Sequence, residues 1–164
     1  MILNASPYVA IKGYADSKIA KCETNDCFVR ATAAAVNVTY DVAHKYVAET
    51  FKRKNRKGTA MVAWVMEKML QRGEKFLGKS FKFIGDPISQ YNPMVRPFTY
   101  YGKGDKQVRR DMTVGTAAKK FNKGRYIVLV TGHAFAIVDG VVVGNWDDSR
   151  ALRKRVHSLI KIGR

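Results

Sequence analysis

Three apolar runs near the C-terminus constrain the fold of this chain more than any other feature. They are RYIVLV at 125–130, HAFAIV at 133–138 and VVVGNW at 141–146. Runs of this length, rich in β-branched and aromatic residues, are typical of β-strands. Asp139-Gly140 separates the last two runs and is a favoured sequence for a hairpin turn. The C-terminal third is therefore predicted to form antiparallel strands.

The N-terminal half shows helical periodicity instead, with polar residues at the expected helix starts. The predicted helices are 26–37 with Asn25 or Asp26 as its cap, 40–53, 60–73 with Thr59 as its cap and Gly73 as its end, and a short one at 113–121. Two further strands are predicted at 8–14 and 79–86. The segment 149–162 fits both a helix and a strand, and we favour one helical turn followed by a strand.

The order of these elements predicts an α+β fold, in which an N-terminal helical part packs on a C-terminal antiparallel β-sheet. The 164 residues contain no repeat and no clear linker, so one domain spanning 1–164 is expected. No apolar run reaches the length of a membrane span, and the N-terminus lacks the pattern of a signal peptide. The two cysteines are too few for a disulfide scaffold and suit a reducing cytoplasm, which is the predicted location.

The charge balance is strongly basic. Thirty Lys and Arg residues against thirteen Asp and Glu give a formal net charge of +17. A field of this size concentrates nucleic acids and acidic proteins near the surface. If several basic runs share a face, they are predicted to contact phosphates. The residues predicted to bind nucleic acid are Lys52, Arg53, Lys54, Arg56, Lys57, Arg109, Arg110, Lys119, Lys120, Arg153, Lys154 and Arg155.

Cys27 is the residue with the clearest chemical potential. It follows Asn-Asp at the predicted start of a helix, where the N–H groups and the helix dipole favour a thiolate, so a lowered pKa is expected. His133 opens a predicted strand and is well placed as a general base. His44 is interpreted as structural or solvated, and His157 has no assigned role. One C-x4-C pair and scattered histidines do not make a zinc site, so no metal and no cofactor is predicted.

The group that would orient the imidazole depends on the hairpin register. A three-residue loop with a left-handed Gly140 pairs His133 with Asn145, and Asn145 and Asp147 then share its face, because side chains alternate along a strand. A two-residue loop instead places Trp146 opposite His133 and turns both polar side chains away. The sequence leaves these two registers open.

The segments NDCFVRA and GHAFAIVDGVVVGNWD resemble the small papain-like cysteine peptidases of bacteriophages and bacteria, and the chain order from Cys27 to Asp147 is the same. The resemblance implies a helical part carrying the cysteine, packed on an antiparallel sheet carrying the histidine. It further implies hydrolysis of a peptide, isopeptide or other amide bond in a protein or peptide substrate. Cys27 would be the nucleophile, His133 the base and Asp147 the orienting acid, with Asn145 as the alternative.

This chain departs from the family pattern at the position that usually stabilises the oxyanion. Papain-like enzymes commonly carry a glutamine six residues before the cysteine, where this chain has Lys21. The backbone N–H of Cys27, with Thr24 or Asn25, is the expected substitute. Loss of one oxyanion donor costs about a hundredfold or more in rate. The alternative function is therefore a weakly active or inactive member of the fold that binds DNA or RNA without sequence specificity, or docks on an acidic protein. A phage origin would place it in a bacterial host cytoplasm.

Overall fold

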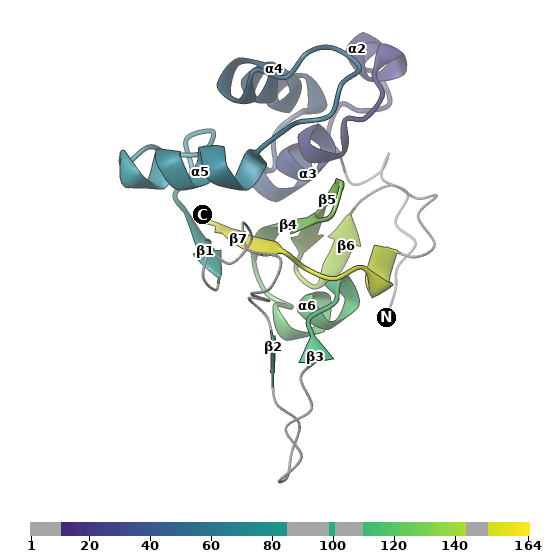
Figure 1. The fold of residues 1–164 in the computed structure, drawn as a ribbon. Coiled ribbons are helices and arrows are strands. Elements are labelled where there is room, and N and C mark those ends of the chain that lie inside the picture. Colours follow the sequence, from purple (N-terminus) through teal and green to yellow (C-terminus); the bar gives the residue numbers. More distant parts are fainter. Residues whose placement is uncertain (1–10, 85–98, 101–109, 144–150) are drawn as a thin grey trace, which may run out of the picture.

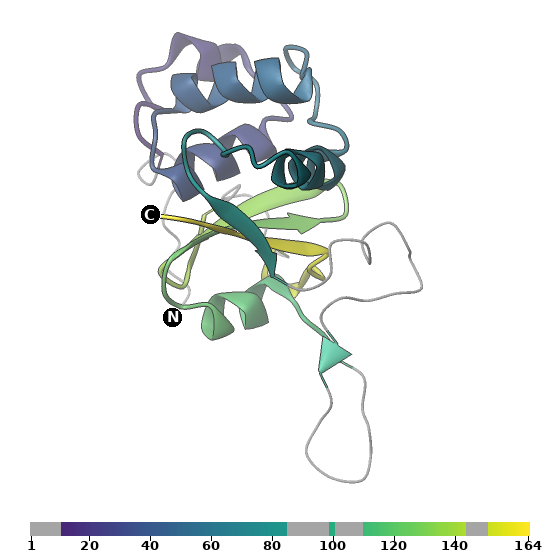
Figure 2. The same ribbon diagram turned by 90° about the vertical axis from the view of Figure 1, so that its left-hand side faces the viewer.

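The computed structural model describes residues 11–84, 99–100, 110–143 and 151–164, and shows a mixed α+β fold (Figure 1). Helices from the N-terminal half cover one face of a five-stranded antiparallel sheet, and a short helix covers the other face (Figure 2). The predicted order of helices followed by an antiparallel sheet is thus confirmed. Within the described ranges, no helix is both long enough and apolar enough to cross a membrane.

The N-terminal helices are α2 (Lys18–Cys22), α3 (Cys27–Val36), α4 (Tyr40–Phe51) and α5 (Val62–Gln71). The predicted helices at 26–37 and 40–53 are confirmed, and Thr39 caps α4 by accepting a hydrogen bond from the Val42 N–H. The prediction that Thr59 caps the third helix is wrong. Met61 has a left-handed backbone (φ 52°), so helical geometry begins only after it.

The predicted end of α5 is confirmed, whereas the predicted N-terminal strand is wrong in its described part. Gly73, at φ 68°, follows the last turn of α5, as expected for a glycine that ends a helix. Residues 11–16 form turns, so the described part of the predicted strand at 8–14 is wrong, and its first residues lie outside the described ranges. The short helix α2 was not predicted, since it spans little more than one helical turn and therefore carries almost no periodic signal.

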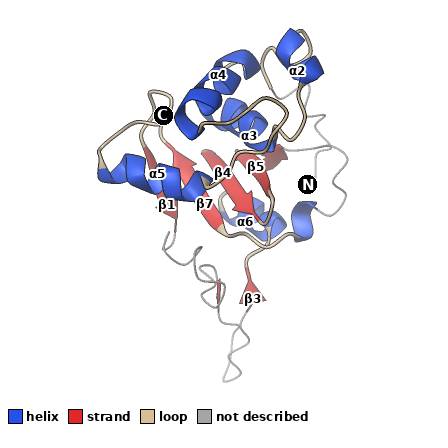
Figure 3. Cartoon of the chain, turned by 45° about the horizontal axis from the view of Figure 1, so that its top comes forward, coloured by secondary structure: helices blue, strands red, loops and turns tan. Residues whose placement is uncertain are grey.

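The main sheet has the strand order β1-β7-β4-β5-β6, with every neighbouring pair antiparallel. Figure 3 shows β1, β7, β4 and β5 side by side in this sheet. Its strands are β1 (Phe81–Ile84), β4 (Arg125–Val130), β5 (His133–Val138), β6 (Val141–Val143) and β7 (Ser158–Ile162). A 3₁₀ turn at Ala151–Arg153 precedes β7, which confirms the predicted helical turn and final strand. A separate two-stranded sheet joins β2 (Thr99–Tyr100) to β3 (Arg110–Asp111), and α6 is Val114–Lys120.

Both faces of the central strands are buried, because helices lie on either side. Ile127, Ala134 and Ala136 pack with α3, α4 and α5. Val128 and Phe135 point to the opposite face and pack with α6. Two-sided burial explains why these strands have nearly continuous apolar sequences in place of an apolar–polar alternation. The small alanines on β5 also allow the alanine-rich α3 to approach the sheet closely.

The hairpin between β5 and β6 has the two-residue loop. Val138 pairs with Val141, so the alternative in which Ile137 pairs with Val141 is wrong. Asp139 (φ 48°) and Gly140 (φ 82°) are both left-handed, as a type I′ turn requires, and this turn matches the twist of the flanking strands. The Asp139 carboxylate also accepts a hydrogen bond from the Gly124 N–H at 2.8 Å, which holds the turn to the start of β4.

Candidate active site

Cys27 and His133 lie at the same end of the sheet. Cys27 is the first residue of α3, and His133 is the first residue of β5, on which α3 packs. The backbone N–H of Ala134 is directed at the Cys27 sulfur, which places the cysteine beside the start of β5. Two residues over a hundred positions apart in the sequence therefore meet in one region of the fold.

A pocket of about 630 Å³ contains both residues. Three parts of the fold form it: the start of α3, the segment 58–64 at the start of α5, and the adjoining ends of β4, β5 and β7. Its described lining includes no Lys, Arg, Asp or Glu residue. The lining is predominantly apolar with a few polar groups, which is the usual character of a ligand pocket.

Burial raises the pKa of the Cys27 thiol, although the backbone N–H groups of Ala134 and Phe28 and the charge of Arg30 act to lower it. The buried Asp26 carboxylate raises it further. The prediction of a lowered pKa was therefore wrong, because desolvation outweighs the start of the helix. In the resting protein the sulfur carries its proton at neutral pH, so its use as a nucleophile requires a proton acceptor.

His133 is half-buried at the edge of the pocket. Its ring contacts the ring of Phe135 edge-on, with the centroids 4.5 Å apart. Phe135 points to the α6 face of the sheet, whereas Ala134 points to the α3 face. The pleat thus sets the imidazole on the α6 side of β5 and the sulfur on the α3 side, and the two share the pocket because both stand where the strand begins.

The predicted third members, Asn145 and Asp147, lie outside the described residues. Both side chains were expected to share the face of His133 only with the three-residue loop, and the observed pairing of Ala136 with Val143 belongs to the two-residue register. The orienting role of Asp147 or Asn145 therefore stays a prediction based on chain order alone.

The predicted oxyanion donors have other partners. Thr24 Oγ1 and Asn25 Nδ2 each donate to the backbone oxygen of Arg56 at 3.3 Å. Lys21, at the glutamine offset, is exposed in the last turn of α2. The hydrogen bonds of Thr24 and Asn25 therefore oppose an oxyanion role, which stays untested, and the backbone N–H groups at the start of α3 are the remaining donors.

Asp26 explains why those N–H groups lack a side-chain cap. It occupies the cap position of α3, as predicted, yet no side chain of a described residue caps this helix. The Asp26 carboxylate is buried and instead accepts hydrogen bonds from Arg30 at 2.6 and 3.0 Å and from the Tyr40 hydroxyl at 2.7 Å. Burial and this hydrogen bond raise the pKa of Tyr40. Asp26 thereby joins α3 to α4 and leaves the first N–H groups of α3 without a side-chain acceptor.

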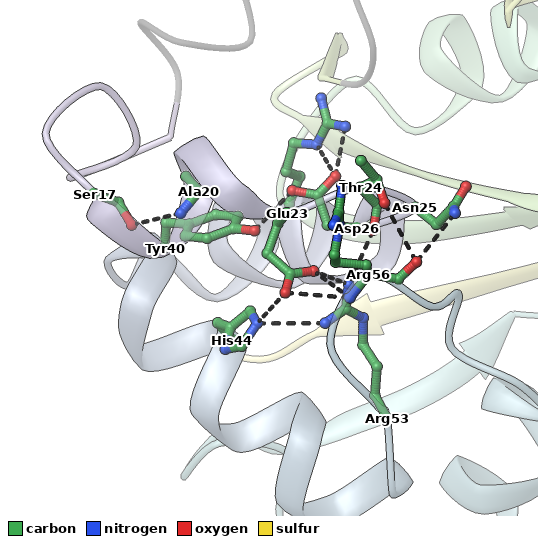
Figure 4. A network of polar contacts seen from close by, with 11 residues as sticks. Ser17, Ala20, Glu23, Thr24, Asn25, Asp26, Tyr40, His44, Arg53 and Arg56 are labelled. Atoms are coloured by element: carbon green, nitrogen blue, oxygen red, sulfur yellow. Dashed lines mark hydrogen bonds and ion pairs between the residues drawn. The ribbon is translucent and has the colours of Figure 1, made fainter.

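A second buried network is centred on Glu23, three residues before Asp26 (Figure 4). Glu23 forms an ion pair with Arg53, and its carboxylate also lies 3.3 Å from His44 Nε2 and accepts from the Arg56 N–H. The side chains of Glu23 and Arg53 are only 4% and 0% exposed. Burial acts to raise the pKa of Glu23, but the hydrogen bonds from Arg53 and Arg56 lower it overall. The network fastens the segment that leads into the pocket wall.

This burial opposes one predicted nucleic-acid contact. Arg53 is enclosed, so its guanidinium is not available to a phosphate group. His44 is also buried, in line with a structural role. The sequence contains no local signal for the burial of Arg53, because the run KRKNRK has the composition of an exposed loop.

The other predicted nucleic-acid residues that the structure describes do not share one face. Exposed side chains in the first run are those of Lys52, Lys54, Arg56 and Lys57, in the segment between α4 and α5. Lys119 and Lys120 are exposed on α6, which covers the opposite face of the sheet. Arg153 and Arg155 are exposed, Lys154 is half-buried, Arg110 is in β3, and Arg109 lies outside the described residues.

Sequence reasoning missed four side chains that line the pocket. His157 Nε2 lies 2.7 Å from Thr131 Oγ1, so a second histidine stands at the same end of the sheet. The pairing of Leu129 with Ser158 brings His157 and Thr131 together, so no local sequence pattern could have shown this contact. Met61 and Trp64 also line the pocket and are 64% and 44% exposed. No group of three or more potential metal ligands occurs among the described residues.

Comparison with known proteins gave no relative. No protein-family model, no curated protein and no solved structure matches the chain.

Proposed function

We propose that the chain is a papain-like thiol hydrolase that cleaves a peptide, isopeptide or other amide bond. Cys27 is the nucleophile, His133 is the base, and Asp147 or Asn145 orients the imidazole. The observation that supports the proposal is the shared pocket, in which the start of α3 carries the sulfur and the start of β5 carries the histidine. The resemblance to phage and bacterial peptidases supplies the class of reaction.

In this mechanism, Cys27 Sγ attacks the carbonyl carbon of the amide while His133 accepts the thiol proton. The N–H groups at the start of α3 donate to the oxyanion that forms. The carbon–nitrogen bond then breaks, and the proton passes from His133 to the leaving amine. A water molecule hydrolyses the thioester, with His133 taking a proton from the water. The products are a carboxylic acid and an amine, and the thiol is restored.

The raised pKa of Cys27 determines how the base must act. Because the resting sulfur is protonated, the proton must be transferred as the nucleophile attacks, and no standing thiolate is available. The imidazole therefore has to reach the sulfur from the α6 side of the strand. A rotation about the side-chain bonds of His133, which lies at a strand end, provides that movement.

The proposal is tested by alkylation of the two cysteines with iodoacetamide, followed by mass spectrometry of each peptide. Cys22 is exposed and serves as an internal reference in every sample. If His133 accepts the proton, Cys27 is already alkylated near neutral pH, and this part of its rate profile is called the neutral component. An isolated buried thiol reacts only at about pH 9 and above. The substitution His133→Ala, or the milder His133→Gln, is expected to remove that component and leave Cys22 unchanged.

His157→Ala is the matched control, because His157 lines the same pocket. It is expected to leave the Cys27 profile unaltered. A Cys27 profile that is the same in the wild type and in both His133 variants would overturn the assignment of the base. Loss of the neutral component in His157→Ala alone would transfer the role to His157.

A further inference from the structure

We propose that a basic hollow at the opposite end of the sheet binds the phosphate groups of a nucleic-acid strand. The hollow is formed by the end of α3, the start of β4 and the end of β7, with Lys79 and Asp139 at its sides. The candidate active site lies at the other ends of the same three elements. The proposal is independent of the hydrolase, and none of the cations in the hollow is among the residues that the sequence predicted to bind nucleic acid.

The charge of this hollow exceeds what the composition alone provides. Five of its thirteen lining residues are Lys or Arg, against 30 of 164 in the whole chain. They are Lys79, Lys123, Arg125, Lys161 and Arg164. Asp139 is the single acidic residue in this lining, and its carboxylate already accepts the Gly124 N–H. None of the five cations forms an ion pair with a described residue.

Strand pairing brings these cations together from distant parts of the sequence. Ile162 on β7 pairs with Phe81 on β1 and with Arg125 on β4. Lys79, two residues before Phe81, therefore lies near the end of β7 that carries Lys161. A hydrogen bond from the Gly163 N–H to the Ser80 oxygen, at 2.7 Å, fastens this edge.

Arg125 is the cation whose position is most firmly fixed. Its Nη1 donates to the backbone oxygen of Ala34 at 2.7 Å. The last carbonyl groups of a helix carry a partial negative charge, so a guanidinium stabilises the end of α3. Arg125 thus contributes to the fold, whereas the side chains of Lys79, Lys123 and Lys161 form no ion pair with any described residue and remain available to a ligand.

Gathering five like charges around one hollow is unfavourable unless anions neutralise them. The hollow measures about 920 Å³, which is far more than one small anion needs. Its cations come from three parts of the chain around a concave space, and this suits a narrow chain of phosphates better than the broad convex surface of an acidic protein. The described lining contains no aromatic side chain on which a base could stack. Binding is therefore expected to involve the backbone and to be indifferent to sequence.

The test uses a fluorescein-labelled oligothymidylate of about 12 nucleotides, a length within the range that single-strand binding sites cover. Fluorescence anisotropy is measured from about 50 mM to about 200 mM salt. The triple variant Lys79→Gln, Lys123→Gln, Lys161→Gln is compared with Lys12→Gln, Lys18→Gln, Lys45→Gln, a control with the same net charge. The control lysines are exposed on the helical side of the molecule.

The first variant is expected to weaken binding by about tenfold or more and to reduce the salt slope by about two, since each phosphate contact on a single strand contributes roughly 0.7. The control is expected to stay within about twofold. An equal loss in both variants would show that only the overall field matters and would overturn the site. Unchanged binding in the first variant would overturn it as well.

Competitors separate the sources of the anion. Displacement by inorganic phosphate or by a nucleoside triphosphate at the same phosphate concentration as the oligonucleotide would assign the hollow to a small phosphate ligand instead. Equal displacement by polyaspartate would assign it to an acidic protein. If the triple variant fails to fold, acetylation of the wild type with and without the oligonucleotide replaces it, and failure to protect Lys79, Lys123 and Lys161 counts against the proposal.

Discussion

The two ends of α3 and the sheet beneath it have opposite characters. At the start of α3 the pocket contains a thiol and two histidines, and no charged residue lines its described part. At the end of α3 the hollow contains five cations and one carboxylate. The helix dipole is positive at the first end and negative at the second. One helix thus presents N–H groups to the candidate nucleophile and carbonyl groups to a cluster of cations.

This contrast teaches that proximity to a helix end does not by itself decide chemistry. Cys27 is at the favourable end of α3, yet burial raises the pKa of its thiol. Arg125 lies at the C-terminal end of α3, which is favourable for a cation, and its hydrogen bond to the Ala34 oxygen stabilises the fold. In both cases, the surroundings of the side chain outweigh or redirect the contribution of the helix.

The largest expected effect is the loss of hydrolysis when Cys27 is replaced, and it distinguishes the pocket at the start of α3 from the hollow at its end. Cys27→Ala is expected to abolish hydrolysis, with a loss of at least about a thousandfold, because the nucleophile is removed. It should leave oligonucleotide binding unchanged. The measurements are fluorophore release from a mixture of peptidyl amides and the anisotropy titration. Cys22→Ala is the control and should alter neither. A fall in oligonucleotide binding with Cys27→Ala would show that the two ends are not independent.

The next effect concerns stability at the thiol end. Arg53→Met leaves the buried Glu23 carboxylate without its ion pair, and this is expected to lower the free energy of unfolding by about 3–5 kcal/mol. Denaturant unfolding measures it, and the exposed Lys54→Met provides a control within about 0.5 kcal/mol. Hydrogen exchange should increase at 58–64 before it does at the basic hollow. A loss below about 1 kcal/mol would show that this network does not fasten the pocket wall.

The same ion pair predicts a dependence on pH. The pKa of Glu23 is lower in the folded protein than its ordinary value of 4.5. Its contribution to stability is therefore complete above that ordinary value and disappears as the pH falls through the lower folded pKa. Unfolding curves of the wild type and Glu23→Gln should converge over this acid range. Parallel curves throughout would contradict the lowered pKa.

A smaller effect is expected at the basic end. A Cβ at residue 163 would lie 3.0 Å from the backbone oxygen of Ser80 and closer still to its Oγ. Gly163→Ala is therefore expected to separate the edge of β1 from β7 and to lower the free energy of unfolding by about 1–3 kcal/mol. It should also weaken oligonucleotide binding by displacing Lys79 from Lys161. Gly58→Ala is the control, because no atom lies within 4 Å of its added Cβ.

The smallest effect is a gain in affinity. Asp139→Asn removes the single carboxylate from the lining of the hollow and retains an oxygen that can accept the Gly124 N–H. Asparagine also tolerates the left-handed backbone of this turn position. Oligonucleotide affinity is expected to rise about twofold to fourfold at low salt, because one repulsive charge disappears. Stability should change by less than about 0.5 kcal/mol, and a decrease in affinity would oppose phosphate binding here.

The parts of the fold that the sequence predicted have local causes. The helix at 27–36, the strands of 125–143 and the final strand follow from apolar periodicity and turn residues. The errors arose where a local rule competes with backbone geometry. Thr59 has the chemistry of a cap, but the left-handed Met61 delays α5. Asp139-Gly140 was compatible with two loop lengths, and the pairing of Val138 with Val141 decided between them.

The candidate site divides in the same way. Cys27 and His133 were identifiable from their positions at element starts and from chain order. His157 and Thr131 were not, because the register of β7 on β4 brings them to the pocket. The burial of Arg53 was also hidden, since its run of charges resembles an exposed loop.

By itself, the sequence determined the secondary structure of the C-terminal sheet, the helix that begins at Cys27, and the excess of positive charge. Those properties depend on neighbouring residues and on composition. The tertiary structure decided that Cys27 shares a pocket with His133, that its thiol pKa is raised, that Arg53 is enclosed, and that five cations surround one hollow. Such properties depend on desolvation and on contacts between distant segments, and neither is encoded in any short stretch of the chain.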